Sequence, residues 1–155
     1  MIPWELLDRC ATPDGKAEMS LFRRGQEYSI RIGHYELMNS RAHGSEEAMA
    51  TLACTSLADA ASPRVLVGGL GMGFTLAAAL AALPPGATAD VAELLGAVLR
   101  WNRGPLGALA GQPLDDPRVR VHEGDVRALL ERSHGLYDAI LLDVDNGPDG
   151  LTQAS

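Results

Sequence analysis

A glycine-rich loop between an apolar run and a helical segment is the feature of this sequence best suited to chemistry. Residues 64–75 read R-V-L-V-G-G-L-G-M-G-F-T, so the apolar run ends in Gly68 and Gly69, with Gly71 and Gly73 close behind. Glycine permits positive φ and lets a ligand approach the backbone without a Cβ in the way. A buried strand, a glycine turn and a helix N-terminus in succession build the nucleotide pocket of a doubly wound sheet.

The spacing of these glycines limits the nucleotide that the loop could hold. Gly69, Gly71 and Gly73 form G-x-G-x-G, in which the third glycine comes one residue earlier than in the dinucleotide-binding G-x-G-x-x-G pattern. The loop contains no G-K-S/T sequence, which excludes a P-loop. Because the loop is short and has no lysine, a ligand with little or no phosphate fits it better than a nucleoside triphosphate. The alternative is a glycine turn that serves only tight packing of strand against helix.

Carboxylates follow the next two predicted strands at positions suited to an adenosine ligand. Glu93 ends the second strand, where it could accept hydrogen bonds from both ribose hydroxyls; the alternative is an exposed acid at a strand end. Asp125 follows the third strand in H-E-G-D-V-R and could accept from the adenine amino group, while the backbone N–H of Val126 donates to the ring. Asp125 would equally well serve as the N-cap of a helix that begins at Val126.

The fourth predicted strand leads into the sequence D-V-D-N-G-P, which begins at Asp143. Carboxylates at the carboxyl end of a central strand point into the crevice where ligands bind. Asp143 would face the reactive end of the ligand, and Asp145 and Asn146 could hold an amine. An acidic pair can bind an ammonium group and accept a proton as the amine becomes a nucleophile. The alternative is a solvated Asp/Asn/Gly turn.

Strands and helices that alternate from Arg64 onward must position these residues. The pattern predicts strands at 65–68, 89–93, 119–122 and 137–144, and helices at 74–83, 95–102, 106–110 and 126–133. Strands that alternate with helices imply βαβ units and a parallel sheet. The predicted fold class is therefore α/β, with a Rossmann-like parallel sheet.

The first forty residues have a different pattern. Residues 18–24 and 27–32 alternate apolar and polar side chains, turns follow both, and 35–38 forms a third short strand, which predicts a small antiparallel β-meander. A helix then opens at G-S-E-E, with Ser45 at a capping position, and runs to about residue 60. We therefore divide the chain into a β-meander, residues 1–43, and a nucleotide-binding domain, residues 44–155.

Composition excludes several classes of partner. The 155 residues carry 13 basic and 20 acidic side chains, a net charge of −7, which argues against nucleic acid as a partner. Cys10 and Cys54 match no metal or redox spacing, and the four histidines are scattered, so no metal is expected. The sequence shows no leader and no apolar run long enough to span a membrane, so we expect a cytoplasmic protein without a membrane partner.

The fourth predicted strand, A-I-L-L-D-V, is nearly continuous in apolar residues, as a strand buried on both faces should be. The sequence nevertheless ends eleven residues after Val144, where further strands normally cover the far side of such a sheet. An uncovered apolar edge invites pairing with another chain. We therefore expect a domain that is incomplete or completes its sheet by association, and we expect self-association through residues 139–144.

These motifs resemble, in order and spacing, the spermidine synthase-like group of class I S-adenosylmethionine-dependent transferases. The resemblance covers most of the chain: the β-meander, V-L-V-G-G-L-G-M-G-F-T-L, V-A-E, H-E-G-D-V and Y-D-A-I-L-L-D-V-D-N. It implies a class I methyltransferase fold that stops after the fourth strand. At matching positions it implies Glu93 on the ribose, Asp125 by the adenine and Asp143 taking the amine proton. Polyamine synthases of this group transfer an aminopropyl group from decarboxylated S-adenosylmethionine to putrescine.

Departures from the family pattern leave the transferred group open. Met72 stands where the family carries an aspartate that holds the aminopropyl ammonium, and residues 47–49 (E-A-M) stand where it carries a tyrosine-histidine-glutamate gate. After the fourth strand, Asn146 occupies the second acidic position of the family, and Asp145 comes one residue early. Met72 favours methyl transfer, whereas the acidic turn that begins at Asp143 favours an amine acceptor.

The sequence thus predicts a transferase that binds S-adenosylmethionine or its decarboxylated form and passes a methyl or aminopropyl group to a small acceptor, with polyamines among the candidates. Two other interpretations stay open. An NAD-dependent oxidoreductase would account for Glu93, but not for the early third glycine or for the acids after the third and fourth strands. A catalytically incomplete domain would bind an adenosyl ligand, or act as an interaction module through its open edge.

Overall fold

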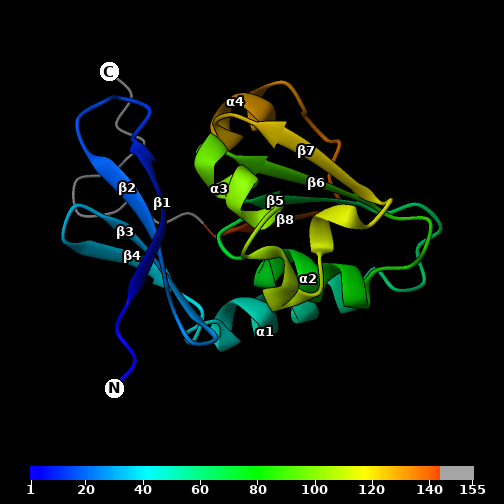
Figure 1. The fold of residues 1–155 in the computed structure, drawn as a ribbon. Coiled ribbons are helices and arrows are strands. Elements are labelled where there is room, and N and C mark those ends of the chain that lie inside the picture. The colour runs from blue at the N-terminus through cyan, green and yellow to red at the C-terminus, as the bar shows by residue number, and fades with distance from the viewer. Residues whose placement is uncertain (144–155) are drawn as a thin grey trace. The chain divides into compact units, whose positions relative to one another are not determined.

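The computed structural model describes residues 1–143, which fall into two compact units, residues 1–42 and 43–143 (Figure 1). Each unit contains one four-stranded sheet. The first unit consists of β1 (Glu5–Ala11), β2 (Glu18–Arg24), β3 (Glu27–Ile32) and β4 (Tyr35–Asn39). The second contains helices α1 (Gly44–Thr55), α2 (Phe74–Ala82), α3 (Gly96–Asn102) and α4 (Val126–Glu131), strands β5 (Arg64–Gly68), β6 (Thr88–Glu93), β7 (Val119–Glu123) and β8 (Ala139–Leu142), and two short 3₁₀ helices, Gly107–Ala110 and Pro113–Asp115.

The first unit is an antiparallel meander with the strand order β1-β2-β3-β4. Its apolar side chains follow the period of two: Met19 lies opposite Ile32 and Leu21 opposite Ile30, and all four are buried. The predicted meander is confirmed, but the sequence analysis missed β1. This strand pairs with β2 through a register shift between Leu6 and Asp8, which interrupts the apolar-polar alternation, and most of its side chains are exposed.

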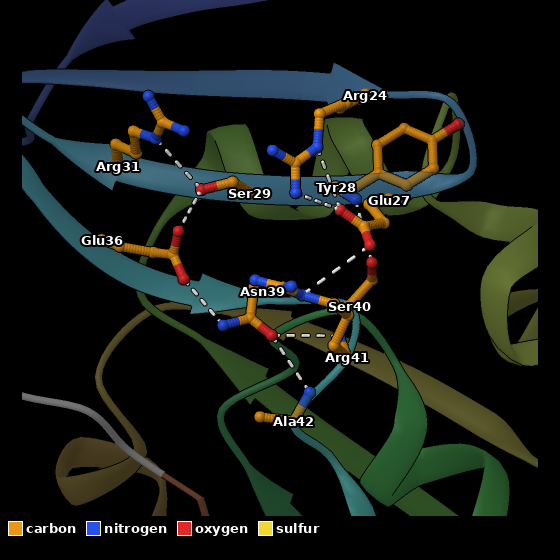
Figure 2. A network of polar contacts seen from close by, with 10 residues as sticks. All are labelled: Arg24, Glu27, Tyr28, Ser29, Arg31, Glu36, Asn39, Ser40, Arg41 and Ala42. Carbon is orange, nitrogen blue, oxygen red and sulfur yellow. Dashed lines mark hydrogen bonds and ion pairs between the residues drawn. The ribbon is translucent and has the colours of Figure 1, made fainter. Parts of the chain in front are cut away.

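A network of polar side chains ties the end of the meander together (Figure 2). The fully buried hydroxyl of Ser29 donates to Glu36 Oε2 at 2.9 Å and accepts from Arg31 Nε at 3.2 Å. Asn39 Nδ2 donates to the other oxygen of Glu36 at 2.7 Å, and Asn39 Oδ1 accepts from the N–H groups of residues 41 and 42. The network therefore fixes both β4 and the segment that leaves it.

The second unit is the predicted parallel sheet, with the strand order β7-β6-β5-β8, which confirms the α/β class. Because β6 and β7 lie on one side of β5 and β8 on the other, right-handed crossovers place α2 and α3 on one face of the sheet and α4 on the opposite face. In Figure 1, α1 and α2 lie together on one side of this sheet and α4 lies on the other. Both faces of β5 are therefore covered, which explains why its side chains form a continuous apolar run.

Most of the predicted boundaries of the second unit agree with the structure to within two residues, and three details differ. The predicted helix over residues 44–60 ends at Thr55, and His43, not Ser45, occupies its N-cap, without a side-chain cap. The predicted short helix over residues 106–110 is a 3₁₀ turn. No helix within residues 1–143 has the length and apolar character needed to cross a bilayer. The cytoplasmic location stays a prediction.

A buried carboxylate joins three strands of the parallel sheet. Asp90, on β6, is fully buried and accepts hydrogen bonds from Arg64 Nε at 3.0 Å and from the Tyr137 hydroxyl at 2.8 Å. His122 Nε2 lies 3.3 Å from its other oxygen. Burial opposes ionisation of Asp90, but the hydrogen bonds from Tyr137, His122 and Arg64 hold its pKa below the ordinary value of 3.8. The sequence analysis singled out none of these residues.

We predict that Asp90→Asn lowers the free energy of unfolding at pH 7 by about 3–5 kcal/mol, because it leaves Arg64 without its buried counter-charge. The lowered pKa means that ionised Asp90 stabilises the fold above pH 3.8 and loses this effect as the pH falls below it. Urea unfolding at pH 7, 5 and 3 measures this effect. Between pH 5 and pH 3 the free energy of unfolding should fall less in the variant than in the wild type. Asp59→Asn, at an exposed position, is the control. Equal stability of Asp90→Asn and Asp59→Asn at pH 7 would contradict the prediction.

Candidate ligand-binding site

The carboxyl ends of the four parallel strands bring the predicted site residues to one edge of the sheet. Gly68 at the end of β5 pairs with Ala92 on β6 and with Leu142 on β8, and Glu93 pairs with Glu123 on β7. Along this edge the order is therefore Asp125 after β7, then Glu93, then the glycine loop, then Asp143 after β8. Ligands of open α/β sheets bind at such an edge.

The glycine loop needs its glycines for two physical reasons. Gly69, Gly71 and Gly73 take φ values of 92°, 56° and 89°, a region that residues with a Cβ rarely adopt. Gly68 has no such φ, but a Cβ there would lie 2.8 Å from Leu142 Cδ2. The N–H of Gly69 donates to the carbonyl of Ala92 at 2.8 Å, which joins the start of the loop to β6. Packing thus accounts for the first glycine and backbone conformation for the other three.

Glu93 is buried beneath the glycine loop. Its Oε2 accepts from the N–H of Leu70 at 2.7 Å and its Oε1 from the N–H of Leu95 at 3.1 Å, and only 7% of the residue is exposed. Burial raises the pKa of Glu93, while the N–H groups of Leu70 and Leu95 act in the opposite direction. The alternative that Glu93 is an exposed acid at a strand end is therefore wrong. The N–H groups of Gly71 and Leu94 also act on this carboxylate, so backbone donors of the glycine loop and of the turn after β6 surround it.

Asp125 caps the N-terminus of α4, as one of the two interpretations of this residue predicts. Its carboxylate accepts from the N–H of Arg127 at 2.9 Å, at the start of α4. Among the described residues, no backbone partner accepts the N–H of Val126, as is normal for the first turn of a helix. Contact of Asp125 and Val126 with adenine stays a prediction, and the cap does not conflict with it.

Asp143 follows β8 and is fixed from two sides. Its N–H donates to the carbonyl of Gly68 at 2.8 Å, and its Oδ2 accepts from the hydroxyl of Thr75 at 3.1 Å. Thr75 is buried in the first turn of α2. From α1, Glu46 adds a second acid, since burial and then the charge of Asp143 raise the pKa of Glu46. The sequence analysis missed Thr75 entirely and treated Glu46 only as part of a helix start.

Asp145 and Asn146 lie outside the described residues, so their role in holding an amine stays a prediction. Met72 is buried, and no residue from 69 to 75 carries a charged side chain. No cluster of three His, Cys, Asp or Glu side chains that could hold a metal ion occurs within residues 1–143.

A buried asparagine supports the loop from α3. Asn102 Nδ2 donates to the carbonyls of Gly71 and Val98, both at 2.8 Å, and 3% of the residue is exposed. A Cβ on Gly73 would lie 3.3 Å from Asn102 Oδ1, so the amide packs closely against the loop. No sequence pattern marks Asn102, because its partner in the loop lies 31 residues away.

Comparison with solved structures shows the fold. The chain matches a spermidine synthase in complex with the transition-state analogue AdoDATO and a spermidine synthase from Thermotoga maritima, each at 17% identity and a TM-score of 0.70 over 89% of this chain. A probable spermidine synthase from Corynebacterium glutamicum ATCC 13032 matches at 19% identity and a TM-score of 0.56 over 90%. The match covers 47%, 46% and 51% of those three chains, so this chain spans about half their length.

The predicted spermidine synthase-like, class I methyltransferase fold is therefore confirmed as a fold. No protein-family model matches the sequence, and no curated protein sequence matches it significantly.

We predict that Asn102→Ala lowers the free energy of unfolding by about 1–3 kcal/mol, because the Gly71 carbonyl loses its buried donor. Amide hydrogen exchange in residues 69–73 should become faster, as the loop loses its support from α3. Arg100→Ala, at an exposed position of the same helix, is the matched control. Equal rates of amide hydrogen exchange in residues 69–73 of the two variants would show that Asn102 does not hold the loop.

Proposed function

We propose that this chain binds a sulfonium nucleoside, S-adenosylmethionine or its decarboxylated form, and transfers a methyl or aminopropyl group to a small amine. The observation that carries the proposal is the buried carboxylate of Glu93, which lies at the end of β6 and is bound to the backbone of the glycine loop. A ribose offers two adjacent hydroxyl donors, the groups that such a carboxylate would accept.

The order of groups along the sheet edge fits an adenosine ligand. Adjacent strands are about 4.8 Å apart, so Glu93 lies about one strand from Asp125 and about two strands from Asp143. With the ribose at Glu93, the adenine would extend toward Asp125 and the sulfonium toward Asp143. The loop has no lysine, which suits a nucleoside without a phosphate chain.

Charge favours a cationic ligand and a cationic acceptor. Asp143 and Glu46 approach each other closely enough for the charge of one to raise the pKa of the other. A sulfonium or an ammonium group between them would relieve this repulsion, as opposite charges within a few ångströms stabilise each other. The amine acceptor of the proposal follows from this pair of acids.

Rate acceleration would come mainly from positioning. The nitrogen of the acceptor attacks in line a carbon bonded to sulfur, and the C–S bond breaks with its electron pair passing to sulfur. Holding the two reactants in this geometry can supply about 7–11 kcal/mol of the barrier. The buried, apolar Met72 in the loop favours the smaller methyl group, because it offers no counter-charge to an aminopropyl ammonium.

We predict that Glu93→Gln weakens binding of the preferred sulfonium nucleoside at least tenfold, because the amide replaces one acceptor oxygen with a donor. Calorimetric titration with S-adenosylmethionine, its decarboxylated form and NAD⁺ in parallel measures this and identifies the transferred group. Glu131→Gln, an exposed acid at the end of α4, is the control and should bind as the wild type does. Preference of the folded wild type for NAD⁺, or binding of none of the three, would refute the proposal.

Self-association through β8 is a second part of the proposal, supported by the position of this strand. Among the described strands β8 is an edge of the sheet, and its side chains Ile140 and Leu142 are 47% and 50% exposed. An apolar strand edge offers unpaired backbone groups to another chain.

We predict oligomers of the wild type in light scattering at high micromolar concentration, and a monomer for Ile140→Lys, because a charge on an edge strand disfavours pairing. Leu52→Lys, at an exposed apolar position of α1, is the control. A monodisperse wild-type monomer, or an equal effect of both substitutions, would rule out the β8 edge as the interface.

A further inference from the structure

A histidine at the start of α1 packs against the first residue of α2. The imidazole of His43 stacks on the ring of Phe74, with centroids 3.8 Å apart and planes inclined by 10°. Phe74 directly follows Gly73, the last glycine of the loop, so the stack places His43 beside the proposed ligand site. His43 Nδ1 also makes a hydrogen bond with Glu47 Oε1, one turn along α1. Two contacts thus fix both the plane and the rotation of the ring.

The contact with Glu47 determines which nitrogen of His43 can accept a proton. An ionised carboxylate only accepts hydrogen bonds, so Nδ1 is the nitrogen that carries the hydrogen. Nε2 of the neutral ring is then left with its lone pair, and no described residue donates a hydrogen bond to it. The side chain of His43 is 32% exposed, so the ring is only partly covered by the protein. A histidine oriented by a carboxylate in this way is a common proton acceptor in enzymes.

Acidic groups from two elements lie near His43. Glu46 and Glu47 come from α1 and Asp143 from the end of β8, while the N-terminal turn of α2 contributes only the neutral Phe74 and Thr75. Glu46 lies within electrostatic range of both His43 and Asp143, because the charges of the two residues act on its pKa in opposite directions. His43 stacks on Phe74 and Asp143 accepts from Thr75, so both residues contact the first turn of α2.

We propose that His43, oriented by Glu47, is the catalytic residue that removes the proton from the amine acceptor. The inference rests on the proposed function and gives Asp143 and Glu46 the role of holding the ammonium. The ammonium R–NH₃⁺ gives one proton to His43 Nε2 and becomes R–NH₂, and the ring becomes imidazolium. The nitrogen lone pair then forms the N–C bond, the C–S bond breaks, and its electron pair turns the sulfonium into a neutral thioether.

The assignment separates two tasks that the sequence analysis gave to Asp143 alone. Asp143 Oδ2 already accepts a hydrogen bond from Thr75, and its negative charge would hold a proton-bearing ammonium in place. His43 presents a lone pair on a ring whose orientation is fixed by Phe74 and Glu47. From the sequence, residues 43–47 could approach the pocket or simply start a helix, and no local pattern pairs His43 with Phe74, which lies far along the chain.

The first experiment tests the orientation of His43 without any activity. Side-chain ¹⁵N NMR of histidine-labelled protein, at a pH where the ring is neutral, should show the Nδ1–H tautomer for His43. Glu47→Gln should shift this ring toward the Nε2–H tautomer, while the exposed His134 should give the same spectrum in both proteins. An Nε2–H tautomer of His43 in the wild type would overturn the inference by itself.

The second experiment tests catalysis. With the sulfonium nucleoside that the wild type prefers and putrescine as the probe acceptor, His43→Ala should lower kcat by about 10²–10⁴-fold. Its Kd for the nucleoside should stay within threefold of the wild type, and added imidazole should restore part of the rate. His134→Ala is the control and should keep the wild-type rate.

Unchanged kcat in His43→Ala, or a loss that imidazole does not restore, would overturn the catalytic role. A folded wild type that transfers neither group would refute the proposed function instead, and would remove the catalytic role with it. The tautomer measurement distinguishes these cases, since it reports on the His43–Glu47 pair in either event.

Discussion

The hydrogen bond from the N–H of Leu70 to the carboxylate of Glu93 is the interaction on which the candidate site depends. It joins the glycine loop after β5 to the end of β6, inside the protein, where burial makes an ionised carboxylate costly unless backbone donors accompany it. The same carboxylate accepts from Leu95 at the start of α3. One side chain therefore sets the shape of the loop, the start of the next helix and the acceptor that a ribose would meet.

Two further groups hold the loop around this bond. Asn102 supports the Gly71 carbonyl from α3, and the N–H of Asp143 donates to Gly68 at the junction of β5 with the loop. The loop is thus anchored to β6, α3 and the end of β8 by groups of the protein itself. A loop held in this way loses less entropy when it binds a ligand.

The likeness to spermidine synthases, at 17–19% identity over about half of their length, establishes a fold and leaves chemistry to the residues of this chain. Those residues separate into a binding side and a reacting side. In the proposal, Glu93 and the uncharged glycine loop form the binding side, which would hold an adenosine. On the other side, acids gather around the His43–Phe74 stack, which suits a cationic acceptor that must lose a proton.

The sequence determined the elements and their order because both depend on local patterns. The apolar run before Gly68, the glycines that follow it and the acids at the ends of the other three parallel strands can be identified from neighbouring residues, and parallel strands bring their carboxyl ends together. Tertiary structure decided which side chains meet, because those contacts join elements far apart in the chain and depend on how helices pack on the sheet. The contacts decided in this way are the Asp90 cluster, the Asn102 and Thr75 hydrogen bonds, the approach of Glu46 to Asp143 and the stacking of His43 on Phe74.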